Sequence, residues 1–90
     1  MNKVNVMPTK AELMEAIIVA LTSLGGTAKT SEIDAKVAET INLSEELLTL
    51  EDDSSTGTVY RYKMRWARTE LRQKGFLTNP TRGTWAIVPK

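Results

Sequence analysis

Apolar side chains recur every three or four positions through residues 9–24, a spacing that lines them up along one face of a helix. They are Leu13, Ile17, Leu21 and Leu24. Thr9 and Glu12 have the Thr-x-x-Glu spacing of a capping box at the start of this segment, and Gly25-Gly26 follows its end. The pattern therefore predicts a first helix over residues 9–24.

Two shorter helices are predicted next. The first covers residues 31–41, with Thr30 as its N-cap. Its apolar side is formed by Ile33, Val37 and Ile41. Residues 27–29, which precede it, are too few for more than a bridging strand. A short helix over residues 45–49 follows, because Ser44 can cap it and the acidic residues after Ser44 favour a helix N-terminus.

The longest helix is predicted over residues 57–74, after a polar loop at residues 51–55. Gly75 follows it as a C-terminal cap residue would. The cationic side chains of Arg72 and Lys74 suit the negative end of the helix dipole. These signals agree on where the helix ends.

Near the C-terminus the period of the apolar positions changes from helical to alternating. Residues 76–78 and 84–88 are predicted to form two strands joined by a loop at residues 79–83. Gly83 in this loop can supply the positive φ that a hairpin loop often requires.

The predicted order is therefore a helix, a short strand, two further helices and a β-hairpin wing over residues 76–88. This mostly α class with a small β-hairpin is the arrangement of a winged helix-turn-helix. The 90 residues of the chain suffice for a single small domain, residues 1–90, built from two packed layers.

Cysteine and histidine are both absent. Their absence excludes disulfides, thiolate zinc sites and Cys/His or Ser/His nucleophilic catalysis. Asp34 and Lys36 have an acid-x-lysine spacing, but they fall on a predicted helix, so we expect both to be surface residues without a metal role. We expect neither an enzyme nor a cofactor or metal.

No apolar run approaches the roughly 18 residues that a membrane span needs, and the first residues lack the hydrophobic stretch of a signal peptide. We therefore expect a cytoplasmic protein without a membrane partner.

The net charge is only +1, but it is unevenly distributed. Residues 1–54 carry four basic and ten acidic residues, a net charge of −6, whereas residues 55–90 carry eight basic residues and one acid, a net charge of +7. Either the basic half attracts an anionic partner, or the two halves mainly neutralise each other after folding.

Four arginines in the longest predicted helix are spaced by four, three and four residues, so they share one side of it. They are Arg61, Arg65, Arg68 and Arg72. Most residues of the opposite arc are apolar or aromatic, with Lys63 and Glu70 among them. This arc contains Val59, Tyr60, Tyr62, Met64, Trp66, Ala67 and Leu71. No acid is interleaved in the arginine row. The row is therefore either a solvated outer face or a contact surface for a polyanion.

Three other features favour the polyanion. Arg82 lies at the tip of the predicted hairpin, where a side chain is exposed. Thr56, Gly57 and Thr58 can bind a phosphate at the start of the basic helix, or can serve as its N-cap, or both. In a winged helix the third helix and the hairpin lie close enough to straddle a DNA major groove and its flanking backbone.

The pattern W-A-R-x-x-L-x-x-x-G at residues 66–75, followed by R-G-x-W at residues 82–85, resembles the N-terminal winged-helix domain of Mrr-type restriction endonucleases. The layout of the preceding helices, with the INLSEELL segment, extends this similarity over nearly the whole chain. The resemblance implies a DNA-binding, target-locating domain that normally precedes a separate nuclease domain. It also implies that five matching residues are structural, namely Trp66, Ala67, Leu71, Gly75 and Trp85.

Double-stranded DNA is therefore the predicted partner, and the nuclease is a further partner, joined covalently or non-covalently. The chain is either a piece of such a nuclease or a stand-alone relative. The candidate DNA-binding residues are Thr58, Arg61, Lys63, Arg65, Arg68, Arg72 and Arg82. The first two arginines of the row are expected to reach base edges, while the other two and Lys63 contact phosphates and Arg82 acts from the wing.

A protein-interaction module is the rival interpretation, since winged helices also serve as docking units. In that case the acidic half would form the partner surface. Its residues are Glu45, Glu46, Glu51, Asp52 and Asp53. Whether the chain forms a homodimer stays open.

Overall fold

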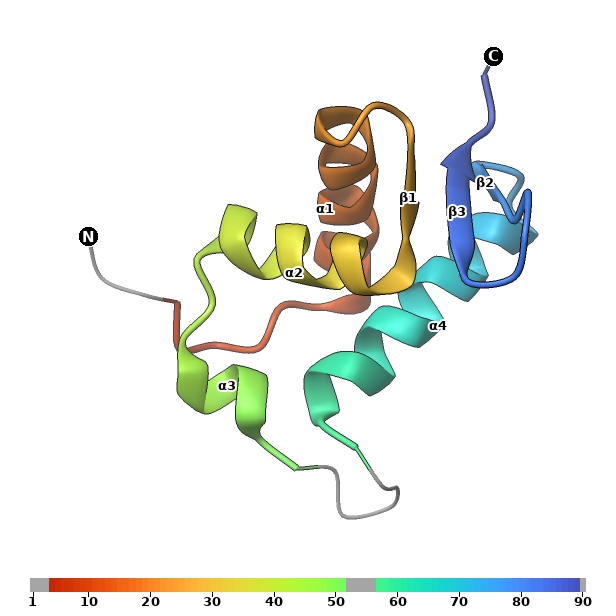
Figure 1. Cartoon of the computed structure of the whole chain (residues 1–90). Coiled ribbons are helices and arrows are strands. Elements are labelled where there is room, and N and C mark those ends of the chain that lie inside the picture. The colour runs from red at the N-terminus through yellow and green to blue at the C-terminus, as the bar shows by residue number, and fades with distance from the viewer. Residues whose placement is uncertain (1–3, 52–56, 90) are drawn as a thin grey trace.

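The structure, a computed structural model, describes residues 4–51 and 57–89. In this part of the chain four helices and a three-stranded antiparallel sheet follow one another (Figure 1). The helices are α1 (Lys10–Ser23), α2 (Thr30–Ile41), α3 (Glu45–Thr49) and α4 (Val59–Gln73), and the strands are β1 (Thr27–Lys29), β2 (Leu77–Thr78) and β3 (Thr84–Ile87). The mostly helical chain with a small antiparallel sheet has the fold class expected of a winged helix-turn-helix.

The helices begin and end within two residues of the bounds that the sequence predicts. At the start of α1, the Thr9 hydroxyl accepts from the Glu12 amide at 3.2 Å, and the Glu12 carboxylate accepts from the Thr9 amide at 2.9 Å. This is the predicted capping box. The expected cap of α2 is wrong, because Lys29 holds the N-cap position and Thr30 is the first helical residue. The Lys29 amide donates instead to the carboxylate of Glu32 at 2.9 Å.

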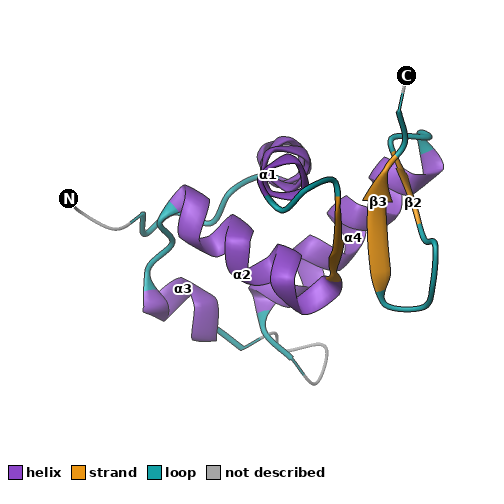
Figure 2. Cartoon of the chain, turned by 45° about the horizontal axis from the view of Figure 1, so that its top comes forward, coloured by secondary structure: helices purple, strands orange, loops and turns teal. Residues whose placement is uncertain are grey.

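β3 is the central strand of the sheet, with β1 on one side and β2 on the other. Ala28 in β1 lies opposite Trp85 in β3, so the short segment after α1 pairs with the far end of the chain. Figure 2 shows the sheet at one end of the helical layer, beside the C-terminal part of α4. The hairpin loop ends at Gly83, whose φ of 79° lies in the left-handed region that favours glycine.

The core lies where α1 packs against α2 and α4. Each large aliphatic side chain removed from water here stabilises the fold by about 1.5–3 kcal/mol. The largest fully buried side chains are Leu13, Ile17, Leu21, Ile33, Val37 and Met64. This cluster fixes α4 to the rest of the domain and so decides which side of α4 faces water.

The buried side of α4 differs from the predicted one. It consists of Tyr60, Met64, Ala67, Arg68 and Leu71. Tyr62 and Trp66 are instead 48% and 50% exposed, so the expectation that Trp66 belongs to the structural interior is wrong. The predicted apolar arc was wider than α1 and α2 can cover, and an aromatic side chain with a polar tip tolerates water better than Met64 or Leu71 does.

Candidate nucleic-acid interface

Two contacts set the position of α4 against α2. The Tyr60 hydroxyl donates to the backbone carbonyl of Asp34 at 2.6 Å. The Arg68 guanidinium forms an ion pair with the Asp34 carboxylate, and the side chains are 8% and 18% exposed respectively. The expectation of an arginine row without acid partners is therefore wrong at Arg68. Asp34 is also not the surface residue that its helical position suggested, because α4 covers it.

Burial affects the titration of this cluster. It raises the pKa of Asp34, although the positive charges of Arg68 and Arg61 oppose the rise. Burial likewise lowers the pKa of Arg68 and raises that of Tyr60. The Nε of Arg68 is buried and lacks a hydrogen-bond partner among the described residues. Arg68 is thus used inside the fold.

Arg61 and Arg65 are exposed on the N-terminal half of α4. Neither has an acidic partner within ion-pair distance in residues 4–51 and 57–89. Thr58 begins the helix, and its hydroxyl accepts from the Arg61 amide at 3.2 Å, so the predicted N-cap is present. Thr56 lies outside the described residues.

Two hollows adjoin along this part of α4, with volumes of about 350 and 530 Å³. They share Thr30, Asp34 and Arg61. The first extends along α4 to Arg65, and the second extends to Gly83 in the wing. Residues that are far apart in the sequence therefore border one continuous depression.

The start of α2 contributes residues that the sequence did not point out. Lys29 and Ser31 are exposed and line the hollow between α4 and the wing. A usable signal was present in the sequence, since Lys29 is a basic residue directly before the predicted helix N-cap Thr30.

The wing is held by Trp85, whose indole N–H donates to the Thr30 hydroxyl at 2.9 Å. The guanidinium carbons of Arg68 and Arg72 lie 5.7 and 5.8 Å from the centre of its ring, within the range of a cation–π contact. Thr30 also donates its backbone N–H to the carbonyl of Gly83 at 3.0 Å. These contacts fix the hairpin against the start of α2 and the side of α4.

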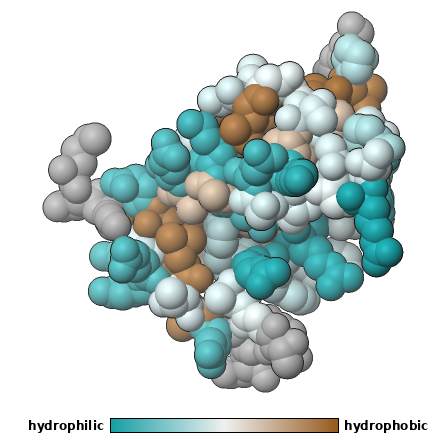
Figure 3. Space-filling view, in the orientation of Figure 1, coloured by the Kyte–Doolittle hydropathy of each residue, from teal (hydrophilic) through white to brown (hydrophobic). Residues whose placement is uncertain are grey.

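Arg72 and Arg82 differ in their surroundings. Arg72 is exposed, but it donates to the side chain of Asn79 at 3.0 Å, and Asn79 in turn donates to the Thr84 carbonyl at 2.8 Å. Arg82 is exposed at the hairpin tip and has no ion-pair partner within the described residues. Figure 3 shows hydrophilic side chains gathered over the N-terminal half of α4 and along the wing.

Lys63 is the candidate that the structure separates from the others. Its ammonium group donates to the backbone carbonyl of Pro8 at 3.3 Å, on the flank of α4 that faces the start of α1. On the same flank Lys10 and Glu70 form an ion pair at 2.9 Å. The hydrogen bond from Lys10 lowers the pKa of Glu70.

Of the acidic residues in the rival interpretation, some lie in the described part of the chain and others do not. Glu45 and Glu46 are exposed in the first turn of α3, and Glu51 is exposed after it. Asp52 and Asp53 lie outside the described residues. Among described side chains, no three acidic ones gather as a metal site would require. None of the described helices has the length and apolar character to cross a membrane.

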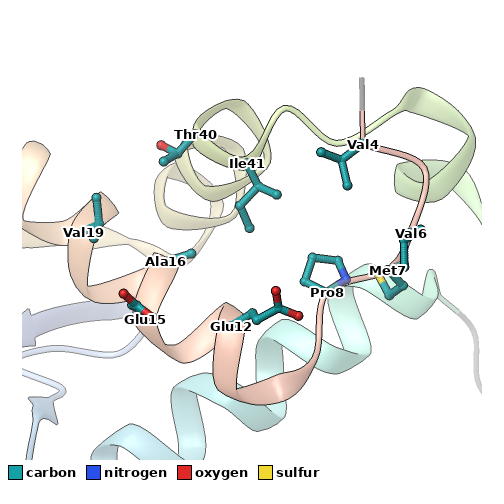
Figure 4. A pocket seen from close by; sticks show the side chains of 10 residues that line it. All are labelled: Val4, Val6, Met7, Pro8, Glu12, Glu15, Ala16, Val19, Thr40 and Ile41. Atoms are coloured by element: carbon teal, nitrogen blue, oxygen red, sulfur yellow. The ribbon is translucent and has the colours of Figure 1, made fainter. Parts of the chain in front are cut away.

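A separate hollow of about 480 Å³ lies between the N-terminal segment, α1 and the end of α2. Figure 4 shows apolar side chains from all three segments around it, among them Val4, Pro8 and Ile41. Glu12 and Glu15 contribute acidic side chains to its lining. It shares no residue with the two hollows beside Arg61.

Comparison with known protein families yields one match. A family model described as the Mrr N-terminal domain matches residues 11–90. The curated proteins and the solved structures yield no match.

Proposed function

Because the chain belongs to the family of Mrr N-terminal domains, a module of restriction systems, we propose that it is a double-stranded DNA-binding domain. In this proposal it serves as the target-recognition module of a restriction-type nuclease or of a stand-alone relative. The nuclease activity resides in another domain or another chain.

The carrying observation is that three separate segments present unpaired cations around one depression. Arg61 and Arg65 on α4 and Lys29 directly before α2 line the depression, and the exposed Arg82 in the wing loop directly precedes Gly83, which lines it as well. In the part of the chain that the structure describes, none of these four has an acidic partner within 4.0 Å. Duplex DNA presents phosphates on both sides of a groove wide enough for a helix, so it suits such a surface.

Each element has a role in the proposed complex. The N-terminal half of α4 enters the major groove, so that Arg61 and Arg65 reach base edges, with guanine as the preferred partner of an arginine. Lys29, Arg72 and Arg82 contact phosphates. The Thr58 hydroxyl, although it caps α4, still has an O–H that can donate to a phosphate oxygen.

Two of the seven residues predicted from sequence receive other roles. Arg68 holds α4 and the wing in position through Asp34 and Trp85, and does not itself contact DNA. Lys63 adds positive charge on the other flank of α4, next to the start of α1. The proposal thus assigns the hydrogen-bonding and ionic contacts with DNA to exposed side chains on the side of α2 and the wing.

Amide chemical shifts of the ¹⁵N-labelled domain, titrated with a short duplex, test this assignment. The largest shifts are expected at residues 58–66, 29–31 and 79–84. The exposed end of α3 and residues 4–7 provide an internal control, because both lie outside the proposed interface. Shifts confined to α3 or to the N-terminal segment would contradict the proposal.

A further inference from the structure

The side of α4 that points straight into solvent carries aromatic residues. The buried Tyr60, Met64, Ala67 and Leu71 define the inward direction of this helix. At about 100° per residue, Tyr62 points away from that direction, and Arg65 and Trp66 lie roughly 60° to one side and roughly 40° to the other side of Tyr62. The outermost face of the proposed recognition helix is therefore centred on Tyr62.

Tyr62 and Trp66 form an edge-to-face pair, with ring centres 6.3 Å apart and ring planes inclined at 69°. Their exposed fractions are 48% and 50%. Among described residues, neither the Tyr62 hydroxyl nor the Trp66 indole N–H has a hydrogen-bond partner. An exposed aromatic pair contributes little to the core, and its apolar surface is available for contact with a partner.

Charges around the pair match a polyanion. Arg61 and Arg65 lie on one side, and a hollow of about 450 Å³ on the other side is lined by Lys10 and Lys63 together with both rings. Glu70 pairs with Lys10 there, so one positive charge of that side remains uncompensated. A helix in the major groove meets a phosphate backbone on each flank and base edges in the middle.

The chemical groups that base pairs expose in the major groove indicate which base an aromatic pair would contact. Among the groups that base pairs present in the major groove, the C5-methyl group of thymine is the apolar one, whereas the others donate or accept hydrogen bonds. We propose that Tyr62 and Trp66 are specificity-determining residues that cover thymine C5-methyl groups. This inference rests on the proposed DNA-binding function. It adds thymine to the bases that α4 contacts, next to those bound by its arginines.

Replacement of thymine by deoxyuridine tests the proposal directly, because it removes the methyl group and keeps every hydrogen-bonding group. Duplexes that the domain binds most tightly are selected from a random-sequence pool, and each thymine is then replaced in turn. We expect one or two positions at which the replacement weakens binding about fourfold, the effect of exposing one buried methyl group.

Three variants locate the effect. Tyr62→Ala/Trp66→Ala is expected to abolish the response to deoxyuridine, while Tyr62→Phe, which keeps the ring, retains it. Arg82→Ala serves as the matched control, because it weakens binding to both duplexes equally and leaves their ratio unchanged. Circular dichroism confirms that each variant is folded before its affinities are compared.

Two results would overturn the inference. If the domain binds duplexes but no thymine replacement changes its affinity more than twofold, the aromatic pair does not read methyl groups, although DNA binding stands. The same holds if the double alanine variant keeps the wild-type response. If no duplex binds at low salt, DNA binding itself fails, and with it the thymine inference.

Discussion

The Asp34 carboxylate on α2 forms an ion pair with the Arg68 guanidinium on α4, and the Asp34 backbone carbonyl accepts from the Tyr60 hydroxyl. Asp34 thus meets α4 at two points that lie two helical turns apart. Arg68 also lies over the ring of Trp85, which belongs to the wing. This group of side chains therefore fixes the angle between α2, α4 and the hairpin, on which the proposed DNA surface depends.

The ion pair makes the effect of Asp34→Ala predictable. The substitution leaves a buried guanidinium without its counter-charge, so we expect the free energy of unfolding to fall by about 3–5 kcal/mol. Asp34→Ala/Arg68→Met should lose much less than the sum of the two single variants. Urea unfolding measures all three, with Lys36→Ala as a control on another side of α2. Additive losses would show that the two side chains do not interact.

A second prediction concerns pH. Burial raises the pKa of Asp34 in the folded state above 3.8, the ordinary value of an aspartate carboxyl. As the pH falls, the Asp34 carboxylate of the folded protein therefore takes up a proton before that of the unfolded chain does. The contribution of Asp34 to stability therefore decreases as the pH rises from 3.8 through the raised pKa, and is constant above it. The difference in unfolding free energy between wild type and Asp34→Asn, followed across this range, should show this direction. An NMR titration that places the Asp34 pKa below 3.8 would contradict it.

Thr30→Val tests how the wing is attached. It preserves the shape of the side chain but removes the acceptor of the Trp85 indole N–H, which costs about 1–2 kcal/mol when the donor is left unpaired. Thermal unfolding measures this loss. If the wing then moves away from α2, Arg82→Ala should weaken DNA binding less in the Thr30→Val background than in the wild type. Equal effects in both backgrounds would show that Trp85 does not position Arg82.

Gly83→Ala should destabilise the hairpin loop through the backbone alone. The φ of Gly83 is 79°, and, apart from Gly83 and its two chain neighbours, no heavy atom of the described residues lies within 4 Å of the position that an added Cβ would take. The expected cost is about 1–2 kcal/mol, that of a left-handed conformation for an L-residue. Gly57→Ala is the control, since Gly57 has equally open surroundings without such a φ. A Tm for Gly83→Ala equal to that of the control would contradict the prediction.

Local signals explain why the sequence predicts most of the fold. The capping box at Thr9, the turn glycine at position 83 and the alternation around Trp85 act over a few residues, so they are readable in one chain. The partner of β1 is not local, because Ala28 meets Trp85 through the folding of the whole domain. The sequence predicts β1 as an isolated bridging piece and leaves its pairing open.

The site was less predictable for the same reason. Arg68 looks like its neighbours in the arginine row, and only the approach of α2 brings Asp34, which is 34 positions away in sequence, to neutralise it. Tyr62 and Trp66 look like core residues, because periodicity reveals apolar character but not how much of an arc the other helices can cover. Lys29 became a candidate once β1 and the wing placed it beside Arg61.

The salt dependence of binding to a duplex of mixed sequence tests the central claim most directly. Each lost phosphate contact should flatten the slope of log affinity against log salt by about 0.9. We therefore predict a flatter slope for Arg82→Ala. Lys36→Ala also removes one positive charge, but Lys36 lies on a side of α2 outside the proposed surface, so its slope should be unchanged. If the folded wild type does not bind at low salt, or if both variants keep the wild-type slope, the proposed DNA surface is wrong.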